Sequence, residues 1–205
     1  FLSHLHFDHV KELPALADNL PGIANEPLTV GCIPAVLEGL KKNIFNGELY
    51  PNFFNLPHPE PLILQEKTLE PGKEVSWGRW RITPIMVNHS VPTAGVIVQD
   101  DQSAFLYSAD TAETERIWAI AGRIPNLKAA FIECSFPNEM QALAGISKHL
   151  TPKLLDQEFR KIGIPDLPLY VYHLKPTYRD RILEQLADLP IPNLTVLEEG
   201  QMVEV

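Results

Sequence analysis

The chain has 205 residues, a hydrophobic fraction of 45% and a formal net charge of −9 at pH 7. A chain of this length can bury a core without disulfide or metal crosslinks, and we expect one domain over residues 1–205. The acidic balance disfavours a nucleic-acid-binding surface, and no apolar run reaches the roughly 18 residues that a membrane span needs.

The two cysteines, Cys32 and Cys134, are far apart in the sequence and do not form a disulfide framework. Free cysteine is most often buried, so both are expected in the core. We expect a cytoplasmic protein without a membrane partner.

Apolar periodicity and the positions of Pro and Gly predict elements along the whole chain. The first half reads as a strand end at 1–3, a helix at 10–20, a strand at 28–33, a helix at 33–45, a Pro- and aromatic-rich loop at 46–66 and a strand at 80–89. The second half reads as strands at 95–100 and 103–110, a helix at 112–124, a strand at 128–136, a helical region at 146–163, a strand at 167–174, a helix at 179–189 and a strand at 194–200. Alternating strands and helices indicate a layered α/β domain.

The segment SHLHFDH concentrates imidazole and carboxylate near the start of the chain. His4, His6 and Asp8 are two residues apart, so an extended segment presents them on one face, and His9 can point elsewhere. These donors suit zinc, and also manganese or iron. The alternatives are a solvated polar turn or a tag remnant, and a tag would not carry Leu, Phe and Asp between its histidines.

Three more candidates follow predicted strands: His89 in ITPIMVNHSVP, Asp110 in FLYSADT and His173 in LYVYHLKP. Taken singly, a histidine after a strand is more often a surface or hydrogen-bonded residue. The strand ends of an α/β sheet meet at one edge, however. The sequence therefore predicts seven ligands at one edge, enough for two metals that share a carboxylate.

The order HxHxDH, lone His, lone Asp, final His resembles the ligand pattern of the metallo-β-lactamase superfamily. The resemblance implies an αββα sandwich that, in this chain, lacks the strands preceding the HxHxDH motif. It also implies two divalent metals, zinc first, with manganese or iron as alternatives. The implied ligands are His4, His6 and His89 for one metal, Asp8, His9 and His173 for the other, and Asp110 as the bridge.

Within the superfamily, NHSVPTAGVIV, LYSADT, FIECSFPNE, KHLTPKLL and YHLKP resemble the class II 3′,5′-cyclic-nucleotide phosphodiesterases. The resemblance implies hydrolysis of cyclic AMP or cyclic GMP to the 5′-monophosphate. It further implies that Asp8 orients the nucleophile, that His149 protonates the leaving oxygen and that Glu133 orients His149. A capping or surface role for His149, and a purely structural hydrogen bond for Glu133, stay open.

Other polar and aromatic residues have plainer explanations. In the loop at 46–58, Tyr50, Phe53, Phe54 and His58 could stack a base, but we favour the interpretation that they pin the loop to the core. Lys148, Lys153 and Lys175 could attract phosphate, but a solvated face is favoured for each.

Four other functions compete with the cyclic-nucleotide phosphodiesterase. A more distant resemblance to tRNA 3′-processing endonucleases suggests action on RNA ends, which the acidic charge disfavours. Hydrolysis of another ester or a lactam would use the same metals. An oxygen-reducing iron module would need a flavin-binding partner domain, and a metal-free interaction protein would not keep the whole ligand set. The expected partner is a small cyclic nucleotide, and a homodimer is compatible with the sequence.

Overall fold

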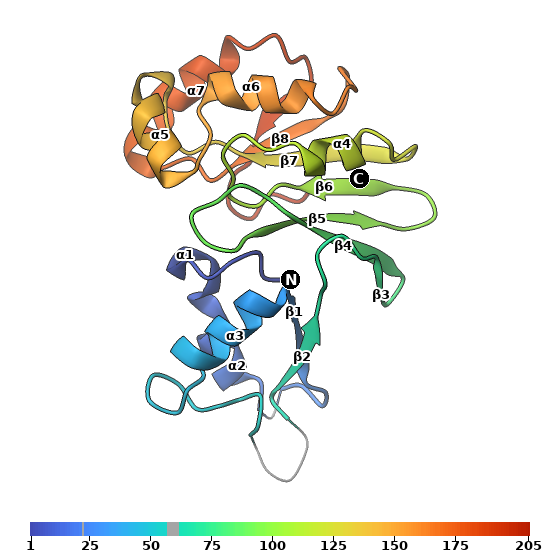
Figure 1. Ribbon diagram of the computed structural model, residues 1–205, viewed down its shortest axis with the longest axis vertical. Helices are drawn as coiled ribbons and strands as arrows, with labels where there is room; N and C mark the ends of the chain where they lie inside the picture. Colours follow the sequence, from blue (N-terminus) through green and yellow to red (C-terminus); the bar gives the residue numbers. More distant parts are fainter. Residues whose placement is uncertain (22, 57–61) are drawn as a thin grey trace. The chain divides into compact units, whose positions relative to one another are not determined.

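The computed structural model describes residues 1–21, 23–56 and 62–205. The chain divides into two compact units, unit 1 with Phe1–Lys73 and Val91–Thr93, and unit 2 with Glu74–Ser90 and Ala94–Val205 (Figure 1). That the whole chain acts as one domain stays a prediction.

Unit 1 packs three helices with a two-stranded parallel sheet. Its elements are α1 (Phe7–Val10), α2 (Glu12–Asn19), β1 (Leu28–Cys32), α3 (Pro34–Asn43) and β2 (Leu64–Thr68). Proline at the first position of α3 has no N–H to leave unsatisfied and holds φ at the helical value, so it fixes where this helix begins. Cys32 is fully buried, as expected for a core cysteine.

The aromatic loop of unit 1 is held against the end of α3. Phe53 and Phe54 are each 6% exposed. Their ring centroids lie 5.9 and 5.4 Å from that of Phe45. These contacts support the structural role that the sequence favours for the two rings. Tyr50 is half-buried, and its N–H donates to the Ile44 carbonyl, whereas His58 lies outside the described residues.

Unit 2 is built on a seven-stranded mixed sheet in the order β3-β4-β5-β6-β7-β8-β9. Its elements are β3 (Val75–Trp77), β4 (Trp80–Met86), β5 (Ala94–Gln99), β6 (Ala104–Tyr107), α4 (Arg116–Ala121), β7 (Leu127–Glu133), η1 (Asn138–Met140), α5 (Gln141–Ser147), α6 (Pro152–Arg160), β8 (Leu169–Tyr172), η2 (Pro176–Tyr178), α7 (Arg179–Ala187) and β9 (Leu194–Val196). Pairing is antiparallel from β3 to β6 and parallel from β6 to β9. Strands β4, β6, β7 and β8 therefore run in the same direction and end at the same edge of the sheet.

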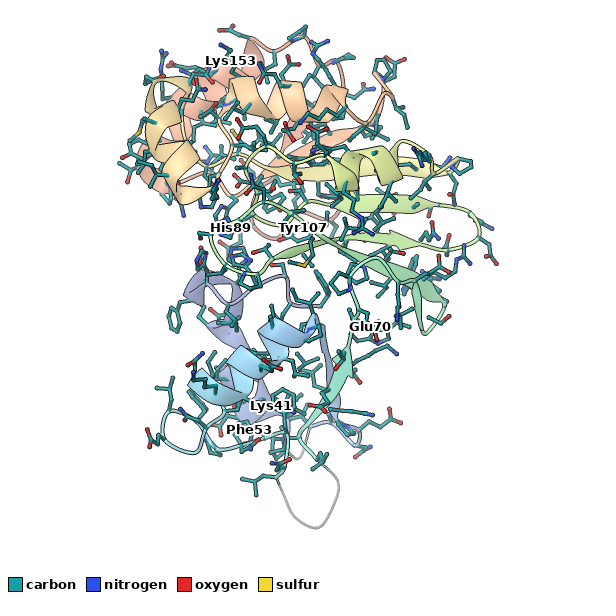
Figure 2. The ribbon with its side chains drawn as sticks, in the orientation of Figure 1. Lys41, Phe53, Glu70, His89, Tyr107 and Lys153 are labelled. Atoms are coloured by element: carbon teal, nitrogen blue, oxygen red, sulfur yellow. The ribbon has the colours of Figure 1, made fainter. Side chains whose placement is uncertain are left out.

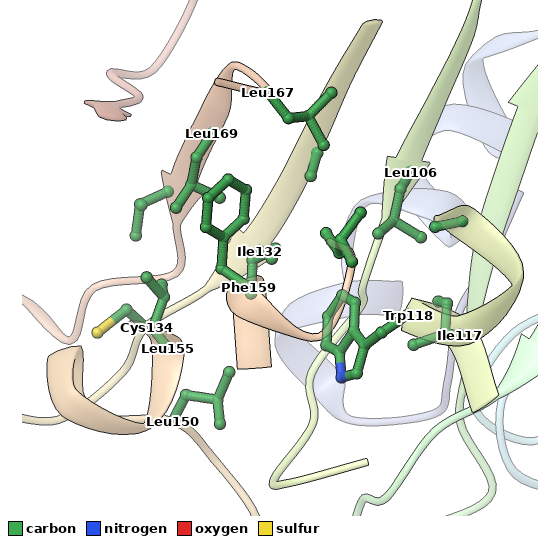
Figure 3. Packing of buried hydrophobic residues seen from close by; sticks show 14 of the residues in the cluster. Leu106, Ile117, Trp118, Ile132, Cys134, Leu150, Leu155, Phe159, Leu167 and Leu169 are labelled. Carbon is green, nitrogen blue, oxygen red and sulfur yellow. The ribbon is translucent and has the colours of Figure 1, made fainter. Parts of the chain in front are cut away.

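The core of unit 2 lies between this sheet and helices α4, α6 and α7 (Figures 1 and 3). Trp118 of α4 is the largest fully buried side chain. Leu155 and Phe159 of α6 join Leu106 and Ile132 of the sheet in the same apolar cluster. Because the side chains of a strand alternate between the two faces of the sheet, every second residue of these strands points toward the helices and into this core.

The other face of the sheet carries aromatic side chains that stack from strand to strand. The rings of Tyr107 and Tyr172 are 5.1 Å apart between centroids. Phe131 lies 4.9 Å from Tyr170 and 5.7 Å from Phe105. These five half-buried residues alternate with the core positions of β6, β7 and β8. The aromatic ladder thus stiffens the three strands that lead to the candidate site.

Glu158 on α6 is a buried carboxylate that ties this helix to α4. Its side chain is 1% exposed and accepts from the Trp118 indole N–H at 2.6 Å and from the Thr114 N–H at 2.8 Å. The Lys161 Nζ lies 2.6 Å from its other oxygen.

We expect Glu158→Ala to lower the free energy of unfolding by about 3 kcal/mol, because the buried Trp118 indole N–H and the half-buried Thr114 N–H lose their acceptor. Asp156→Ala on the same helix is the control. It removes only a carboxylate paired with the exposed Arg160, so its expected cost is about 0.5 kcal/mol. Urea denaturation measures both. Equal losses would mean that Glu158 contributes no more than a surface ion pair.

Several local expectations were wrong. Residues 1–6 are in no strand, although the Leu2 N–H donates to the Gly31 carbonyl beside β1. Helix α1 begins at Phe7, so Asp8 and His9 lie in a helical turn and Asp8 does not continue the extended face of His4 and His6. Strands β2 and β3 were not predicted, because both are short and mostly polar and their pairing partners lie elsewhere in the chain.

Two other expectations concern the surface. Lys153 is exposed, and Lys148 and Lys175 are half-buried. Among the described residues, no helix is both long and apolar enough to cross a membrane.

Candidate metal centre

In unit 1, the histidines of the SHLHFDH segment come together. The ring centroid of His4 lies 4.8 Å from that of His6 and 4.1 Å from that of His9. The Asp8 carboxylate is 3.8 Å from the His9 Nε2, and its side chain is 54% exposed. The turn into α1 therefore gathers three imidazoles and leaves Asp8 more open than they are.

The SHLHFDH segment packs on α3 through Leu5. A Cβ atom at Gly39 would lie only 2.0 Å from the Leu5 Cδ1, so the absence of a side chain at position 39 lets Leu5 seat on the helix. Leu5 stands between His4 and His6.

In unit 2, four polar side chains stand at the edge where β4, β6, β7 and β8 end. His89, labelled in Figure 2, follows β4. Asp110 follows β6, Glu133 is the last residue of β7, and His173 follows β8. The prediction that strand ends gather His89, Asp110 and His173 at one edge of a sheet holds for unit 2, because the two crossovers from β6 to β7 and from β7 to β8 keep these strands parallel.

The donor atoms at this edge are close enough to share a cation. Asp110, His149 and His173 each offer one ligand atom, and these atoms all lie within 4.8 Å of one another. The His173 Nε2 is 3.6 Å from the Asp110 carboxylate. The His149 ring lies 5.1 Å from that of His89 and 5.4 Å from that of His173, between centroids. Asp110 is 1% exposed, so its charge is held where solvent does not screen it.

Glu133 and His149 form a buried pair. The His149 Nδ1 lies 2.7 Å from the Glu133 Oε1, and the two residues are 6% and 0% exposed. Burial raises the pKa of Glu133 to about 8, and the charge of Asp110 adds to the effect, while His173, the Thr111 N–H and the Ser135 hydroxyl oppose it. A carboxyl group with such a pKa holds a proton readily, and the short contact places this proton between Glu133 and His149.

Ser135 is a site residue that the sequence did not reveal. Its hydroxyl is fully buried and lies 3.0 Å from the Glu133 Oε2, 3.2 Å from the His149 Nδ1 and 2.8 Å from the His173 Nδ1. The one available signal was its spacing, since residues two apart on an extended segment face the same side. Serine is too common after strands for that spacing to predict a role.

The same nitrogen is engaged in three of the candidate histidine ligands. The Nδ1 of His4 lies 3.0 Å from the Ser3 hydroxyl. The Nδ1 of His89 lies 2.9 Å from the Lys148 carbonyl, and that of His173 contacts the Ser135 hydroxyl. A histidine that donates through one nitrogen presents the other to a metal. The donor set of imidazoles and buried carboxylate therefore fits a divalent cation bound through Nε2 atoms.

Strained backbone is concentrated at the same place. In the described part of the chain, the non-glycine residues with positive φ are Ala109, Lys148 and His173, at 55°, 61° and 66°. Each such residue costs about 1–3 kcal/mol and persists only where its surroundings enforce it. Ala109 precedes Asp110, and Lys148 precedes His149 while its carbonyl faces His89. The strained residues thus aim four of the candidate side chains.

A close approach of two strands supports the turn before Asp110. A Cβ atom at Gly95 would lie 2.7 Å from the Ser108 carbonyl oxygen and 2.8 Å from that of Tyr107. Only glycine lets β5 pass this close to the end of β6.

The seven predicted ligands thus form two groups, one in each unit. Unit 1 holds His4, His6, Asp8 and His9, and unit 2 holds His89, Asp110 and His173. That the two groups share a pair of metals stays a prediction.

Comparison with known proteins identifies the fold. The unliganded structure of yeast PDE1 is 23% identical, with a TM-score of 0.83 over 97% of this chain and 66% of that chain. The metallo-β-lactamase-fold protein YhfI from Bacillus subtilis is 16% identical, with a TM-score of 0.77 over 98% of this chain and 75% of that chain. The short form of human tRNase Z is 14% identical, with a TM-score of 0.71 over 100% of this chain and 77% of that chain.

The chain therefore spans about two thirds of the yeast PDE1 chain, 66% of its length. No curated protein sequence matches it. The model of a family described as the beta-lactamase superfamily domain matches residues 1–191, which cover both units. The chain therefore belongs to the beta-lactamase superfamily and has the metallo-β-lactamase fold of metal-dependent hydrolases.

Proposed function

We propose that this protein hydrolyses 3′,5′-cyclic nucleotides to 5′-monophosphates with two divalent metals. The observation that carries the proposal is the buried Glu133–His149 pair at the strand edge that also holds Asp110 and His173. A proton donor beside a metal-ligand set is what the hydrolysis of an alkyl phosphodiester needs, because the departing alkoxide is a poor leaving group. The sequence segments around these residues resemble the class II phosphodiesterases, and the similarity to yeast PDE1 agrees with that resemblance.

The proposed metal ligands are His4, His6 and His89 for one cation, Asp8, His9 and His173 for the other, and Asp110 between them. Divalent cations held by these donors would stabilise the negative charge of a phosphoryl transition state and make water more acidic. Zinc is the first choice for such donors, with manganese and iron as alternatives.

The chain's own residues would complete the reaction. Asp8, whose side chain is half exposed, would orient the attacking water. His149 would donate the proton of its Nε2 to the 3′ oxygen as the bond between phosphorus and that oxygen breaks. Glu133 would hold the His149 ring through Nδ1 and stabilise the imidazole that remains. Water supplies the oxygen that the product phosphate gains.

The test is a substrate panel with the purified, metal-loaded protein. Cyclic AMP, cyclic GMP, bis(p-nitrophenyl) phosphate and a precursor tRNA are compared by kcat/KM. We expect a cyclic nucleotide to give the 5′-monophosphate and to be preferred over the precursor tRNA. The net charge of −9 argues in the same direction, since tRNA binding needs many phosphate contacts.

A higher kcat/KM for the precursor tRNA would replace this proposal with RNA-end processing, the activity that the similarity to human tRNase Z brings forward. Cleavage of the aryl ester alone would leave a hydrolase of a different natural ester.

A further inference from the structure

The Ser135 hydroxyl lies where the Glu133–His149 pair meets His173. It is fully buried and within hydrogen-bond distance of all three side chains. A serine hydroxyl has one proton to donate and two lone pairs to accept with. The direction of that one proton therefore decides which atoms around it must carry protons of their own.

The surroundings of Glu133 fix the direction. Its Oε2 also accepts from the Leu150 N–H at 3.4 Å. The carbonyl-type oxygen of a carboxyl group accepts better than its hydroxyl oxygen, so two donors aimed at Oε2 assign any proton of the group to Oε1. The proton of the Glu133–His149 contact lies on the other side, between Oε1 and Nδ1. The Ser135 O–H therefore donates to the Glu133 Oε2 at 3.0 Å.

With its proton directed at Glu133, the Ser135 oxygen is an acceptor toward His173. The His173 Nδ1, 2.8 Å away, must then carry a hydrogen. The other acceptor near the hydroxyl, the His173 carbonyl at 3.2 Å, leads to the same result, because a hydroxyl that donates there still accepts from Nδ1.

We propose that Ser135 is a positioning residue that fixes the Nδ1–H tautomer of His173, so that Nε2 keeps its lone pair for a metal. Glu133 then serves two tasks through its two oxygens, since Oε1 holds the proton donor His149 and Oε2, through Ser135, sets the ligand His173. The inference rests on the proposed ligand role of His173 and not on the identity of the substrate.

Nitrogen NMR of the metal-free wild-type protein with ¹⁵N-labelled histidine tests the tautomer directly. The His173 signals are assigned by their loss in His173→Asn. We expect the shifts and couplings of a neutral ring with hydrogen on Nδ1. A ring with hydrogen on Nε2 overturns the proposal, whatever the variants of Ser135 do.

Metal affinity tests the role of the hydroxyl. We expect Ser135→Ala to weaken zinc binding about 10–100-fold in competition with a chromophoric chelator, as loss of a hydrogen bond to a ligand usually does. The His173 spectrum should shift toward hydrogen on Nε2. Ser135→Thr keeps the hydroxyl, so it should restore the Nδ1–H spectrum and the affinity.

Ser108→Ala is the matched control. Ser108 is also fully buried at a strand end. Its hydroxyl donates to the Ala109 carbonyl at 2.7 Å, accepts from the Glu133 N–H at 3.3 Å and lies 3.2 Å from the Tyr172 hydroxyl, so it contacts the same strand ends as Ser135 but no imidazole nitrogen in these hydrogen bonds. We expect this variant to bind zinc within about threefold of wild type, well short of the loss of a ligand's hydrogen bond. Unchanged affinity and an unchanged His173 spectrum in folded Ser135→Ala would refute the role.

These readouts separate the inference from the proposed function. A protein that binds zinc through His173 with hydrogen on Nδ1 but cleaves no cyclic nucleotide would support the role of Ser135 and contradict the proposed substrate. Hydrolysis of cyclic nucleotides by a folded Ser135→Ala variant with wild-type zinc affinity would support the proposed substrate and contradict the role of Ser135.

Discussion

Asp110→Asn should nearly abolish cyclic-nucleotide hydrolysis, with a loss in kcat of about 10³-fold, the upper end of the effect of removing one preorganised electrostatic group from an active site. The substitution keeps the shape of the side chain and removes the charge that would bridge two cations. Asp110 is buried and directly follows β6 through the strained Ala109, so its position is set by the fold. Metal content measured alongside kcat should fall below two ions per chain.

The fold should survive this change, because a neutral amide replaces a buried charge that repels Glu133. Circular dichroism and urea denaturation of the metal-free protein check this expectation. Asp101→Asn is the control, since that carboxylate is 93% exposed on the turn at the opposite edge of the sheet. Asp110→Asn with wild-type activity and two bound metals would disprove the bridging role.

His149→Ala should lower kcat for a cyclic nucleotide by about 10²–10⁴-fold, the usual contribution of a general acid. The 3′ oxygen leaves as an alkoxide and needs the proton that His149 donates, whereas p-nitrophenolate leaves without one. Hydrolysis of bis(p-nitrophenyl) phosphate should therefore be impaired far less. Comparing kcat for the two substrates, with the same protein and metal, measures the difference.

The metal content of the His149→Ala variant distinguishes proton donation by His149 from a role as a metal ligand. His149 lies in a group with Asp110 and His173 whose donor atoms could hold a cation. A variant that keeps its metals but loses only the alkyl substrate supports proton donation. Loss of metal, or equal losses on both substrates, would instead make His149 a ligand. Glu133→Ala should follow the pattern of His149→Ala if the two residues work as a pair.

Much of the candidate site could be predicted from local sequence. His89, Asp110 and His173 each follow an apolar run that breaks at a turn, and a strand with its end is a local property. The parallel arrangement follows from the alternation of strands and helices. The sequence analysis did not predict strands β2 and β3, which are short and mostly polar. They are strands because β2 pairs with β1 and β3 pairs with β4.

The buried pair of Glu133 and His149 was placed by resemblance, and its geometry came from the fold. The residues are 16 positions apart, and the left-handed Lys148 at the end of α5 turns His149 back toward β7. The outcome for Asp8 was different, because α1 begins earlier than the alternating pattern suggests and carries this residue off the extended face.

The sequence by itself determined which chemical groups the protein carries and that His89, Asp110 and His173 stand at the ends of strands, because hydrophobic period and chain breakers act over a few residues. Only the tertiary structure decided that Ser135 touches Glu133, His149 and His173 at once, and that three candidate ligand histidines, His4, His89 and His173, each have Nδ1 in a polar contact. The direction of a hydrogen bond depends on every donor and acceptor around it, and those come from segments that are distant in the chain.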